Sequence, residues 1–356
     1  MSEENAAEVL VSVDGGAGRL SLNRPKAIHA LTHGMCDIMV DALLAWRDDA
    51  GVKAVIVDHA EGRGFCAGGD IRVLSESAKT DGVDALAFWH REYRLNHLMF
   101  VYPKPIVAFM DGITMGGGVG ISQPAKYRVA TERTVYAMPE TGIGLFPDVG
   151  GGWYLSRMPG RTGQYLAVTG GRIDGADAIA LGVATHYIES DRIPEVKAAI
   201  AANPEDVVAI LDAASTTPPA GKLAEVRADI DRLFASDRLE DIYAALEADG
   251  SDWAAKQIAL MNTKSPQTMK VALRELVEGA KHADFADEMR MEYAVASRVL
   301  MRPDFVEGVR AVIVDKDNAP KWNPPSVADT PDALIDSFFA PLPAGEEWTP
   351  LPEAGA

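Results

Sequence analysis

The first half of the chain repeats one arrangement, in which an apolar strand is followed by a glycine-rich turn and then by a helical pattern. The strand VKAVIVDH at 52–59 precedes GRGFCAGGD, and IVAFMDG at 106–112 precedes MGGGVG at 115–120. Continuous apolar runs are typical of strands that are covered on both faces, and glycine lets the backbone turn in little space. The arrangement therefore predicts an α/β fold built from short repeated units.

Other elements follow from the same periodicities. Two apolar stretches at 8–13 and 18–22 flank Asp14, Gly15 and Gly16 and predict a β-hairpin. Apolar residues at helical spacing predict helices over about 33–47 and 83–99.

The residue pattern changes near residue 190. Beyond that point charged residues and helical spacing predict helices almost throughout. From 318 onward it is rich in proline and acids, which favours extended chain. We expect a core over 1–190, a helical C-terminal region over 191–325 and an extended tail over 326–356.

Composition excludes several classes of function. The net charge of -18 over 356 residues opposes binding to nucleic acid or to an anionic membrane, and no run approaches the roughly 18 apolar residues of a membrane span. The acidic start MSEENAAE lacks the basic flank of a signal peptide, so a cytoplasmic protein is expected. The two cysteines form no CxxC pair and the seven histidines are scattered, so we expect no metal site.

Residues 138–152, MPETGIGLFPDVGGG, carry two acids, Glu140 and Asp148, among glycines, prolines and apolar residues. A carboxyl group with little water around it has its pKa raised toward the working pH, which suits acid-base chemistry. The alternative is structural: Pro139 and Glu140 would start a helix, and Asp148 would cap the next one.

The glycine turns at 64–70 and 115–120 can each present backbone N-H groups at the start of a helix, where negative charge is favoured. Two such turns could hold one carbonyl oxygen as it becomes an oxyanion. Neither turn ends in the Gly-Lys-Ser/Thr of a P-loop, and no GxSxG occurs. Turns tightened by glycine for packing alone are the structural alternative.

These residues resemble the crotonase (enoyl-CoA hydratase/isomerase) superfamily. The landmarks are NRPKAIHALT at 23–32, GFCAGGDIR at 64–72, KPIVAFMDGITMGGGVGIS at 104–122 and the stretch 138–152. Within the superfamily, MPETGIGLFPDVGGGWYLSRMPG and HREY are similar to the 3-hydroxyisobutyryl-CoA hydrolases. The resemblance covers about residues 8–325.

The resemblance implies a spiral core of ββα units and a helical C-terminal region that closes an acyl-CoA site. It implies an oxyanion hole formed by the N-H groups of Ala67 and Gly117, with Glu140 and Asp148 as the catalytic acids. Glu92, in HREY, matches the acid that contacts the substrate, although a Glu92 on the wet face of its helix is the alternative.

The cationic side chains of Arg24, Lys26 and Arg72 lie beside family CoA-binding segments and could meet the CoA phosphates, or could be ordinary solvated cations. No separate cofactor is implied, since CoA belongs to the substrate. The resemblance also allows a homo-oligomer.

One departure from the hydratase pattern concerns the reaction. Where hydratases carry a second catalytic glutamate, this chain has Gly120. The resemblance therefore implies hydrolysis of 3-hydroxyisobutyryl-CoA in valine breakdown, with an enoyl-CoA hydratase or isomerase as the alternative. For Glu140, direct attack on the thioester and activation of water both stay open.

Overall fold

The computed structural model describes residues 7–352, so the outermost ends of the predicted core and tail lie outside the described residues. The chain forms two compact units, each assembled from three segments. The first contains residues through Gly69, Arg94–Tyr136 and Ile173–Ala224, and the second contains Asp70–Tyr93, Ala137–Arg172 and the chain from Glu225 onward. The boundaries predicted at 190 and 325 divide the chain along its sequence, whereas each compact unit combines segments that are far apart in the sequence. These boundaries stay predictions.

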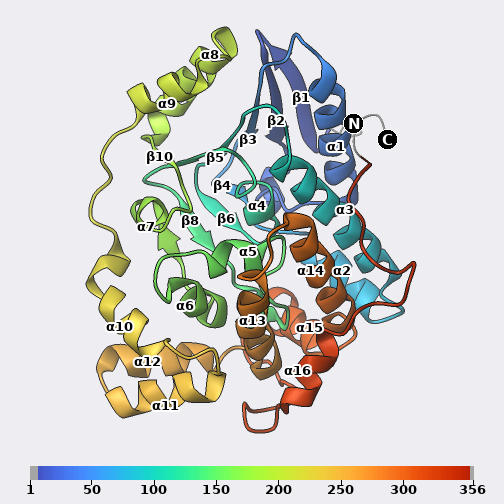
Figure 1. Ribbon diagram of the computed structural model, residues 1–356, viewed down its shortest axis with the longest axis vertical. Coiled ribbons are helices and arrows are strands. Elements are labelled where there is room, and N and C mark those ends of the chain that lie inside the picture. Colours follow the sequence, from blue (N-terminus) through green and yellow to red (C-terminus); the bar gives the residue numbers. More distant parts are fainter. Residues whose placement is uncertain (1–6, 353–356) are drawn as a thin grey trace. The chain divides into compact units, whose positions relative to one another are not determined.

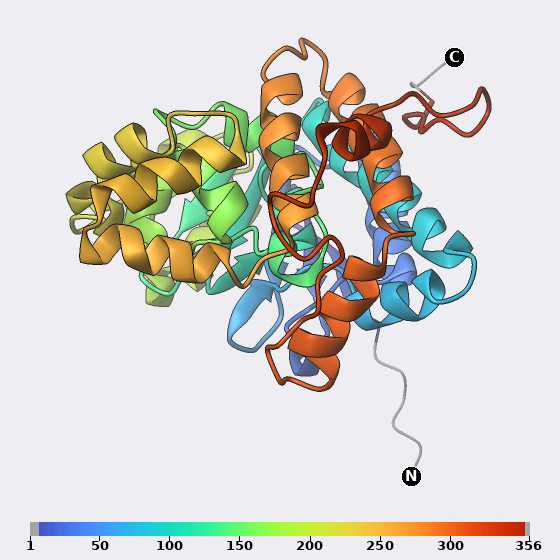
Figure 2. The same cartoon turned by 90° about the horizontal axis from the view of Figure 1, so that it is seen from below.

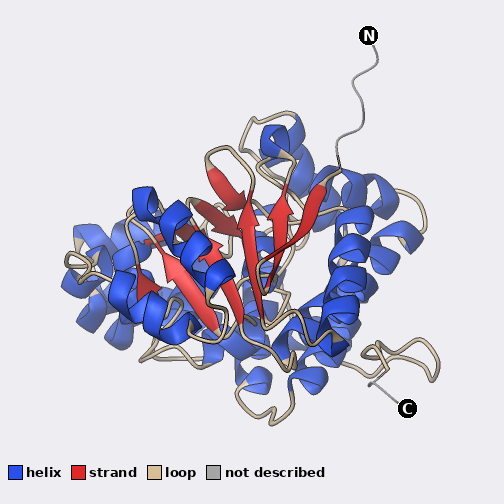
Figure 3. Ribbon diagram, turned by 90° about the horizontal axis from the view of Figure 1, so that it is seen from above, coloured by secondary structure: helices blue, strands red, loops and turns tan. Residues whose placement is uncertain are grey.

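The first unit is built on two sheets, drawn in red in Figure 3. The larger has the order β1-β2-β3-β5-β7-β10 and is parallel except for the β1-β2 hairpin. Its strands are β1 Val9–Asp14, β2 Ala17–Leu22, β3 Ala54–His59, β5 Ile106–Met110, β7 Tyr127–Ala130 and β10 His186–Tyr187. The smaller sheet, in the order β4-β6-β8-β9, contains β4 Gly64–Cys66, β6 Ile113–Met115, β8 Val135–Ala137 and β9 Ile173–Asp174.

The strands alternate between the two sheets along the chain. Each of the successive pairs β3-β4, β5-β6 and β7-β8 gives its first strand to the larger sheet and its second strand to the smaller one. The predicted repetition of strand and glycine turn is therefore a real structural repeat, and the predicted α/β fold class is confirmed. The predicted hairpin is also confirmed as β1 and β2.

The helices that complete the first unit pack on these sheets (Figure 1). They are α1 His33–Asp48, the C-terminal part of α3 Val83–Phe100, α4 Gly117–Gly120, α7 Gly175–Ala180, α8 Ile193–Ala202 and α9 Val207–Ala214, with the 3-10 turns η1 Pro25–Ala27, η3 Ser190–Arg192 and η4 Lys222–Glu225. Buried residues of α8 and α9, among them Ile200 and Leu211, share one apolar core with Ile56, Val107 and Phe109. Burial of this apolar face is what holds the charged α8 segment on the sheet.

The second unit is helical (Figure 2). Its elements are α2 Ile71–Ala78, the first part of α3, η2 Glu140–Ile143, α5 Gly151–Ser156, α6 Thr162–Thr169, α10 Arg227–Leu233, α11 Leu239–Asp249, α12 Asp252–Met261, α13 Pro266–Gly279, α14 Phe285–Val299, α15 Pro303–Val309, η5 Arg310–Val314 and α16 Asp332–Phe338. Helix α13 contacts α5, α6 and α16, and its buried residues lie on almost every side of it. It is therefore the central helix of this unit.

The tail departs from the prediction of extended chain, because it contains α16. Farther on, the indole of Trp348 is only 1% exposed, and its Nε1 donates to the carbonyl of His90 on α3 at 3.1 Å. The tail is therefore anchored to the second unit through an apolar side chain. None of the helices among residues 7–352 is both long and apolar enough to cross a bilayer.

Asp58 on β3 is a buried acid of the first unit with several charged partners. Its carboxylate is 2% exposed and accepts from Arg19 at 2.7 Å, from Lys197 at 2.5 Å and from the hydroxyl of Ser21. These partners tie β2, β3 and α8 together. Removing one member of such a group leaves buried charge uncompensated.

We expect Asp58→Asn to lower the free energy of unfolding by about 3 kcal/mol, the scale for breaking a buried ion pair. The matched control is Asp48→Asn, because Asp48 is 71% exposed and pairs with Arg47 at 3.5 Å. Exposed pairs contribute about 0 to 1 kcal/mol, so the control should hardly change stability. Thermal melts followed by circular dichroism check the difference, and equal losses in the two variants would contradict it.

Candidate active site

The two predicted oxyanion turns lie against each other in the first unit. A Cβ on Gly118 would collide with the carbonyl oxygen of Cys66, and a Cβ on Gly68 would lie 3.7 Å from the amide nitrogen of Gly117. This close approach requires glycine, so the glycines do pack the two turns. Asn96 adds a further support by donating from Nδ2 to the carbonyl of Gly120 at 2.9 Å.

The two predicted amide donors, Gly117 and Ala67, differ in whether their N-H groups already have hydrogen-bond partners. Gly117 is the first residue of α4, where the N-H groups lack partners within the helix. The N-H of Ala67, by contrast, donates to the carbonyl of Ile28 at 2.9 Å. This bond uses the donor that the prediction assigned to a ligand, so the N-H of Ala67 is not free for that role in this structure.

Glu140 begins the 3-10 turn η2, which packs on α13 and α15 of the second unit. The turn closes through the N-H of Leu145, which donates to the carbonyl of Glu140 at 3.0 Å. The side chain is 5% exposed, and its Oε2 has no hydrogen-bond partner among the described residues. Burial, and then the charge of Asp148, raises the pKa of Glu140 well above its usual range.

Asp148 is 4% exposed and accepts a hydrogen bond from the hydroxyl of Tyr93 at 2.8 Å. Burial raises the pKa of Asp148 to about 6, while the Tyr93 hydroxyl and the backbone N-H of Asp148 itself oppose the rise. The capping alternative is wrong, because the N-cap of α5 is Gly150 and no side chain caps it. Asp148 therefore keeps a carboxyl group that titrates close to neutral pH.

Glu92 completes this acid group from α3. It is 2% exposed, and its Oε1 has no hydrogen-bond partner among the described residues. Burial first, then the charges of Asp148 and Glu140, raise the pKa of Glu92 well above its usual range. The wet-face alternative is therefore wrong. The predicted acids Glu92, Glu140 and Asp148 come together in the second unit, close enough to influence one another's ionisation.

Tyr93 is a site residue that the sequence pattern did not single out, since its spacing placed it in an apolar stripe of α3. Its ring is buried, and its hydroxyl contacts Asp148. Burial and the charge of Asp148 raise the pKa of Tyr93 well above its usual value, so the phenol stays a proton donor. Its position directly after Glu92 in HREY was the available signal.

The predicted CoA-binding cations have protein partners of their own. Arg24 pairs with Glu8 at 3.0 Å and also donates to the carbonyl of Ala30, while Arg72 donates to the carbonyl of Ile313 at 3.0 Å. Lys26 is exposed. Their contact with CoA stays a prediction.

The chain is similar to known proteins over nearly its whole length. The family model "Enoyl-CoA hydratase/isomerase" matches residues 17–339. A protein of Xenopus tropicalis named "3-hydroxyisobutyryl-CoA hydrolase, mitochondrial" is 42% identical over 344 residues, which cover 94% of this chain and 89% of the relative. The protein of the same name from Homo sapiens is 39% identical over 346 residues, covering 95% of this chain and 89% of the relative.

Two solved structures have closely similar folds. A carnitinyl-CoA dehydratase from Mycobacterium thermoresistibile has a TM-score of 0.93 at 45% identity and covers 98% of this chain and 100% of its own. An enoyl-CoA hydratase from Rhodobacter sphaeroides 2.4.1 has a TM-score of 0.90 at 36% identity and covers 96% of this chain and 99% of its own.

The expected cytoplasmic location is contradicted, because the relatives of this chain are named as mitochondrial enzymes. The reason is physical: net charge and the lack of an apolar span argue against membrane insertion, and they do not distinguish one aqueous compartment from another.

We expect Glu92→Gln to stabilise the protein in a pH-dependent way. The pKa of Glu92 is higher in the folded state than in the unfolded state. Below the unfolded pKa the carboxyl is protonated in both states, so its burial costs no folding free energy through ionisation. Above that value folding must take up a proton, and stability falls as pH rises toward the folded pKa. Glutamine avoids this cost, so the melting temperature of the variant should match that of the parent at about pH 4 and exceed it at about pH 8.

The control for this measurement is Glu76→Gln on α2, whose side chain is 69% exposed. It should show no such pH-dependent gain. A Glu92→Gln variant with the same difference in melting temperature at both pH values would mean that ionisation of Glu92 is not linked to folding.

Proposed function

We propose that this chain, which belongs to the enoyl-CoA hydratase/isomerase family, hydrolyses a short β-hydroxyacyl-CoA thioester, with 3-hydroxyisobutyryl-CoA as the first candidate substrate. The observation that carries the proposal is the buried group of Glu92, Glu140 and Asp148, which suits acid-base chemistry on a small polar acyl group. The names of the relatives support this substrate, and such a reaction would serve valine breakdown. The crotonase-like fold and the helical C-terminal region were both predicted and are confirmed.

Hydrolysis of a thioester transfers the hydroxide part of water to the acyl carbon and a proton to the departing CoA thiolate. Glu140, once ionised, can take a proton from water or attack the acyl carbon itself. In the second case the C-S bond breaks, a mixed anhydride forms, and water then cleaves the anhydride and regenerates Glu140. Both routes need the carboxylate form, which the raised pKa makes a stronger base.

Asp148 suits proton transfer in either route. With a pKa of about 6 it exists in both protonation states near neutral pH. The bond from Tyr93 leaves one carboxyl oxygen of Asp148 for water and fixes the orientation of the group. Asp148 can therefore orient the attacking water or pass its proton on.

The glycine turns can supply the electrophilic half of the reaction. The N-H of Gly117 and the amides after Ala67 can donate hydrogen bonds to the thioester oxygen as negative charge develops on it. Arg24, Lys26 and Arg72 are proposed contacts of the CoA phosphates. A homo-oligomeric state stays a prediction.

Hydration or isomerisation is the second candidate, because the two solved relatives are named as a dehydratase and a hydratase. Adding water across a double bond needs an acid and a base on one face. Gly120, in α4, supplies no carboxylate at the position where hydratases carry their second glutamate. Thiol release from 3-hydroxyisobutyryl-CoA, measured beside the loss of ultraviolet absorbance of crotonyl-CoA, distinguishes the two: hydration without thiol release would overturn the proposal.

We expect Glu140→Gln to lower kcat for thiol release by about 100-fold or more, the scale for losing a positioned base or nucleophile. Glutamine keeps the size of the side chain, so circular dichroism should show a folded protein. A folded variant with near-normal turnover would exclude Glu140 from the chemistry.

Glu92 is expected to select substrates that carry a hydroxyl group. Its buried Oε1 can accept from the substrate hydroxyl, and an analogue without that group leaves the acceptor unpaired at a cost of about 1 to 3 kcal/mol. Isobutyryl-CoA should therefore react about 10- to 100-fold more slowly in kcat/KM than 3-hydroxyisobutyryl-CoA. Glu92→Ala should reduce this ratio, and an unchanged ratio would show that Glu92 does not recognise the hydroxyl.

A further inference from the structure

The chain turns sharply directly after Asp148. Val149 has a φ of 55 and Gly150 a φ of 93, both in the left-handed region, before α5 begins at Gly151. This region is strained for a β-branched residue such as valine and persists only where the surroundings hold it. Since Val149 and Asp148 are adjacent, whatever holds this turn also sets the direction of the Asp148 side chain.

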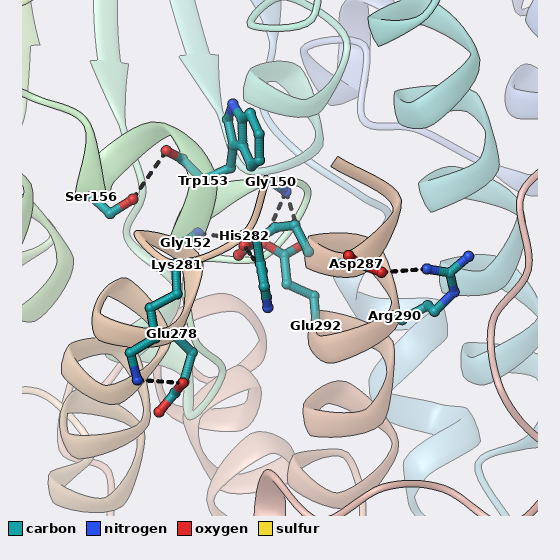
Figure 4. Close-up of polar contacts among 12 residues, drawn as sticks. Gly150, Gly152, Trp153, Ser156, Glu278, Lys281, His282, Asp287, Arg290 and Glu292 are labelled. Atoms are coloured by element: carbon teal, nitrogen blue, oxygen red, sulfur yellow. Dashed lines mark hydrogen bonds and ion pairs between the residues drawn. The ribbon is translucent and has the colours of Figure 1, made fainter. Parts of the chain in front are cut away.

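Glu292 on α14 is the group that holds it (Figure 4). Its Oε2 accepts from the N-H of Gly150 at 2.8 Å, and its Oε1 lies 3.1 Å from the same nitrogen and 3.4 Å from the N-H of Gly152. The side chain is fully buried at 0% exposure. Burial raises the pKa of Glu292 well above its usual range, and the oxygens of a carboxyl group accept backbone N-H groups in either protonation state.

Two further glutamates face Glu292, but neither has a hydrogen bond to these amides. Glu275 on α13 and Glu288 on α14 are each 0% exposed and place an oxygen within 4.8 Å of those of Glu292. Glu288 pairs with His282 at 2.7 Å, while Glu275 interacts with the carboxyl group of Glu292. Burial and the charge of Glu288 raise the pKa of Glu292, and its bonds to Gly150 and Gly152 lower it. All three glutamates are buried, and Glu275 and Glu288 also pack against Gly152, but among these three Glu292 is the one with hydrogen bonds to the amides of the turn.

We propose that Glu292 is a positioning residue for Asp148: by accepting from Gly150 and Gly152 it fixes the left-handed turn at Val149 and keeps the Asp148 carboxyl against the Tyr93 hydroxyl. It acts through the backbone and does not itself take part in the reaction. The inference rests on the proposed function, because the orientation of Asp148 affects turnover only if Asp148 serves the reaction.

The test compares three variants of Glu292 in the thiol-release assay. Glu292→Ala should lower kcat by about 10- to 100-fold, the scale for a misplaced catalytic group, while KM changes less than about threefold. Glu292→Gln should keep kcat within about threefold of the parent, because its amide oxygen can take the place of Oε2 and still accept from the N-H of Gly150. Glu292→Asp keeps the carboxyl group but is one methylene too short, so it should behave as the alanine variant does.

The matched control is Glu275→Gln, which changes an equally buried acid of the same cluster that has no bond to the turn. It should keep normal kcat and KM. A control that loses as much kcat as Glu292→Ala, with a similar loss of melting temperature, would overturn the proposal in favour of a general packing effect. If Glu292→Ala does not fold, the aspartate variant decides, and normal kcat in it would overturn the proposal as well.

Asp148→Asn separates failure of this inference from failure of the proposed function. Loss of turnover in Asp148→Asn with normal kcat in Glu292→Ala and Glu292→Asp would overturn the positioning role alone. Normal turnover in Asp148→Asn would overturn the role of Asp148, and the positioning role with it. Loss in Asp148→Asn and in Glu292→Ala, with rescue by Glu292→Gln, is the result expected.

Discussion

The burial of carboxyl groups is the constraint on which the second unit depends. Seven acids among the described residues of this unit are at most 5% exposed: Glu92, Glu140, Asp148, Glu275, Glu288, Glu292 and Asp304. An ion taken out of water costs several kcal/mol unless it is paired or neutralised. Tyr93, the amides of Gly150 and Gly152, and His282 supply donors to three of these groups. The helices must bring these donors to the acids, so the arrangement of α3, α5 and α14 follows from the electrostatics as much as from apolar packing.

In the first unit the groups available for the proposed chemistry are backbone amides rather than carboxyl groups. Its glycine turns approach so closely that side chains are excluded at Gly118, which leaves amide groups as the chemistry available there. Amides have no ionisation to tune, and their direction is set by the strands and helices on either side of them. The first unit therefore offers backbone donors, whereas the second unit offers titratable side chains.

Sequence reasoning succeeded where the determining contacts are local. The helix at 33–47 and the β1-β2 hairpin follow from periodicity and turn residues alone, and the grouping of Glu92, Glu140 and Asp148 was reached through family resemblance. Sequence reasoning failed where the role of a residue depends on a hydrogen-bond partner far away in the sequence. The Ala67 amide is taken by Ile28, nearly 40 residues earlier, and the role of Tyr93 depends on Asp148, 55 residues away. Glu292 lies in the region that the sequence predicts only as helical and charged, and nothing in its neighbourhood along the chain points to Gly150.

The contacts made by Trp348 and Glu292 also order events in time. Ribosomes add about 5 to 20 residues per second, and Gly150 precedes its acceptor Glu292 by 142 positions. The acid-bearing turn therefore waits on the order of ten seconds for the side chain that holds it, and α3 waits longer for Trp348, 258 positions after His90. A nascent chain carries all three acids of the proposed site long before it can fix them. The turn at Asp148 can therefore be held only after α14 has left the ribosome.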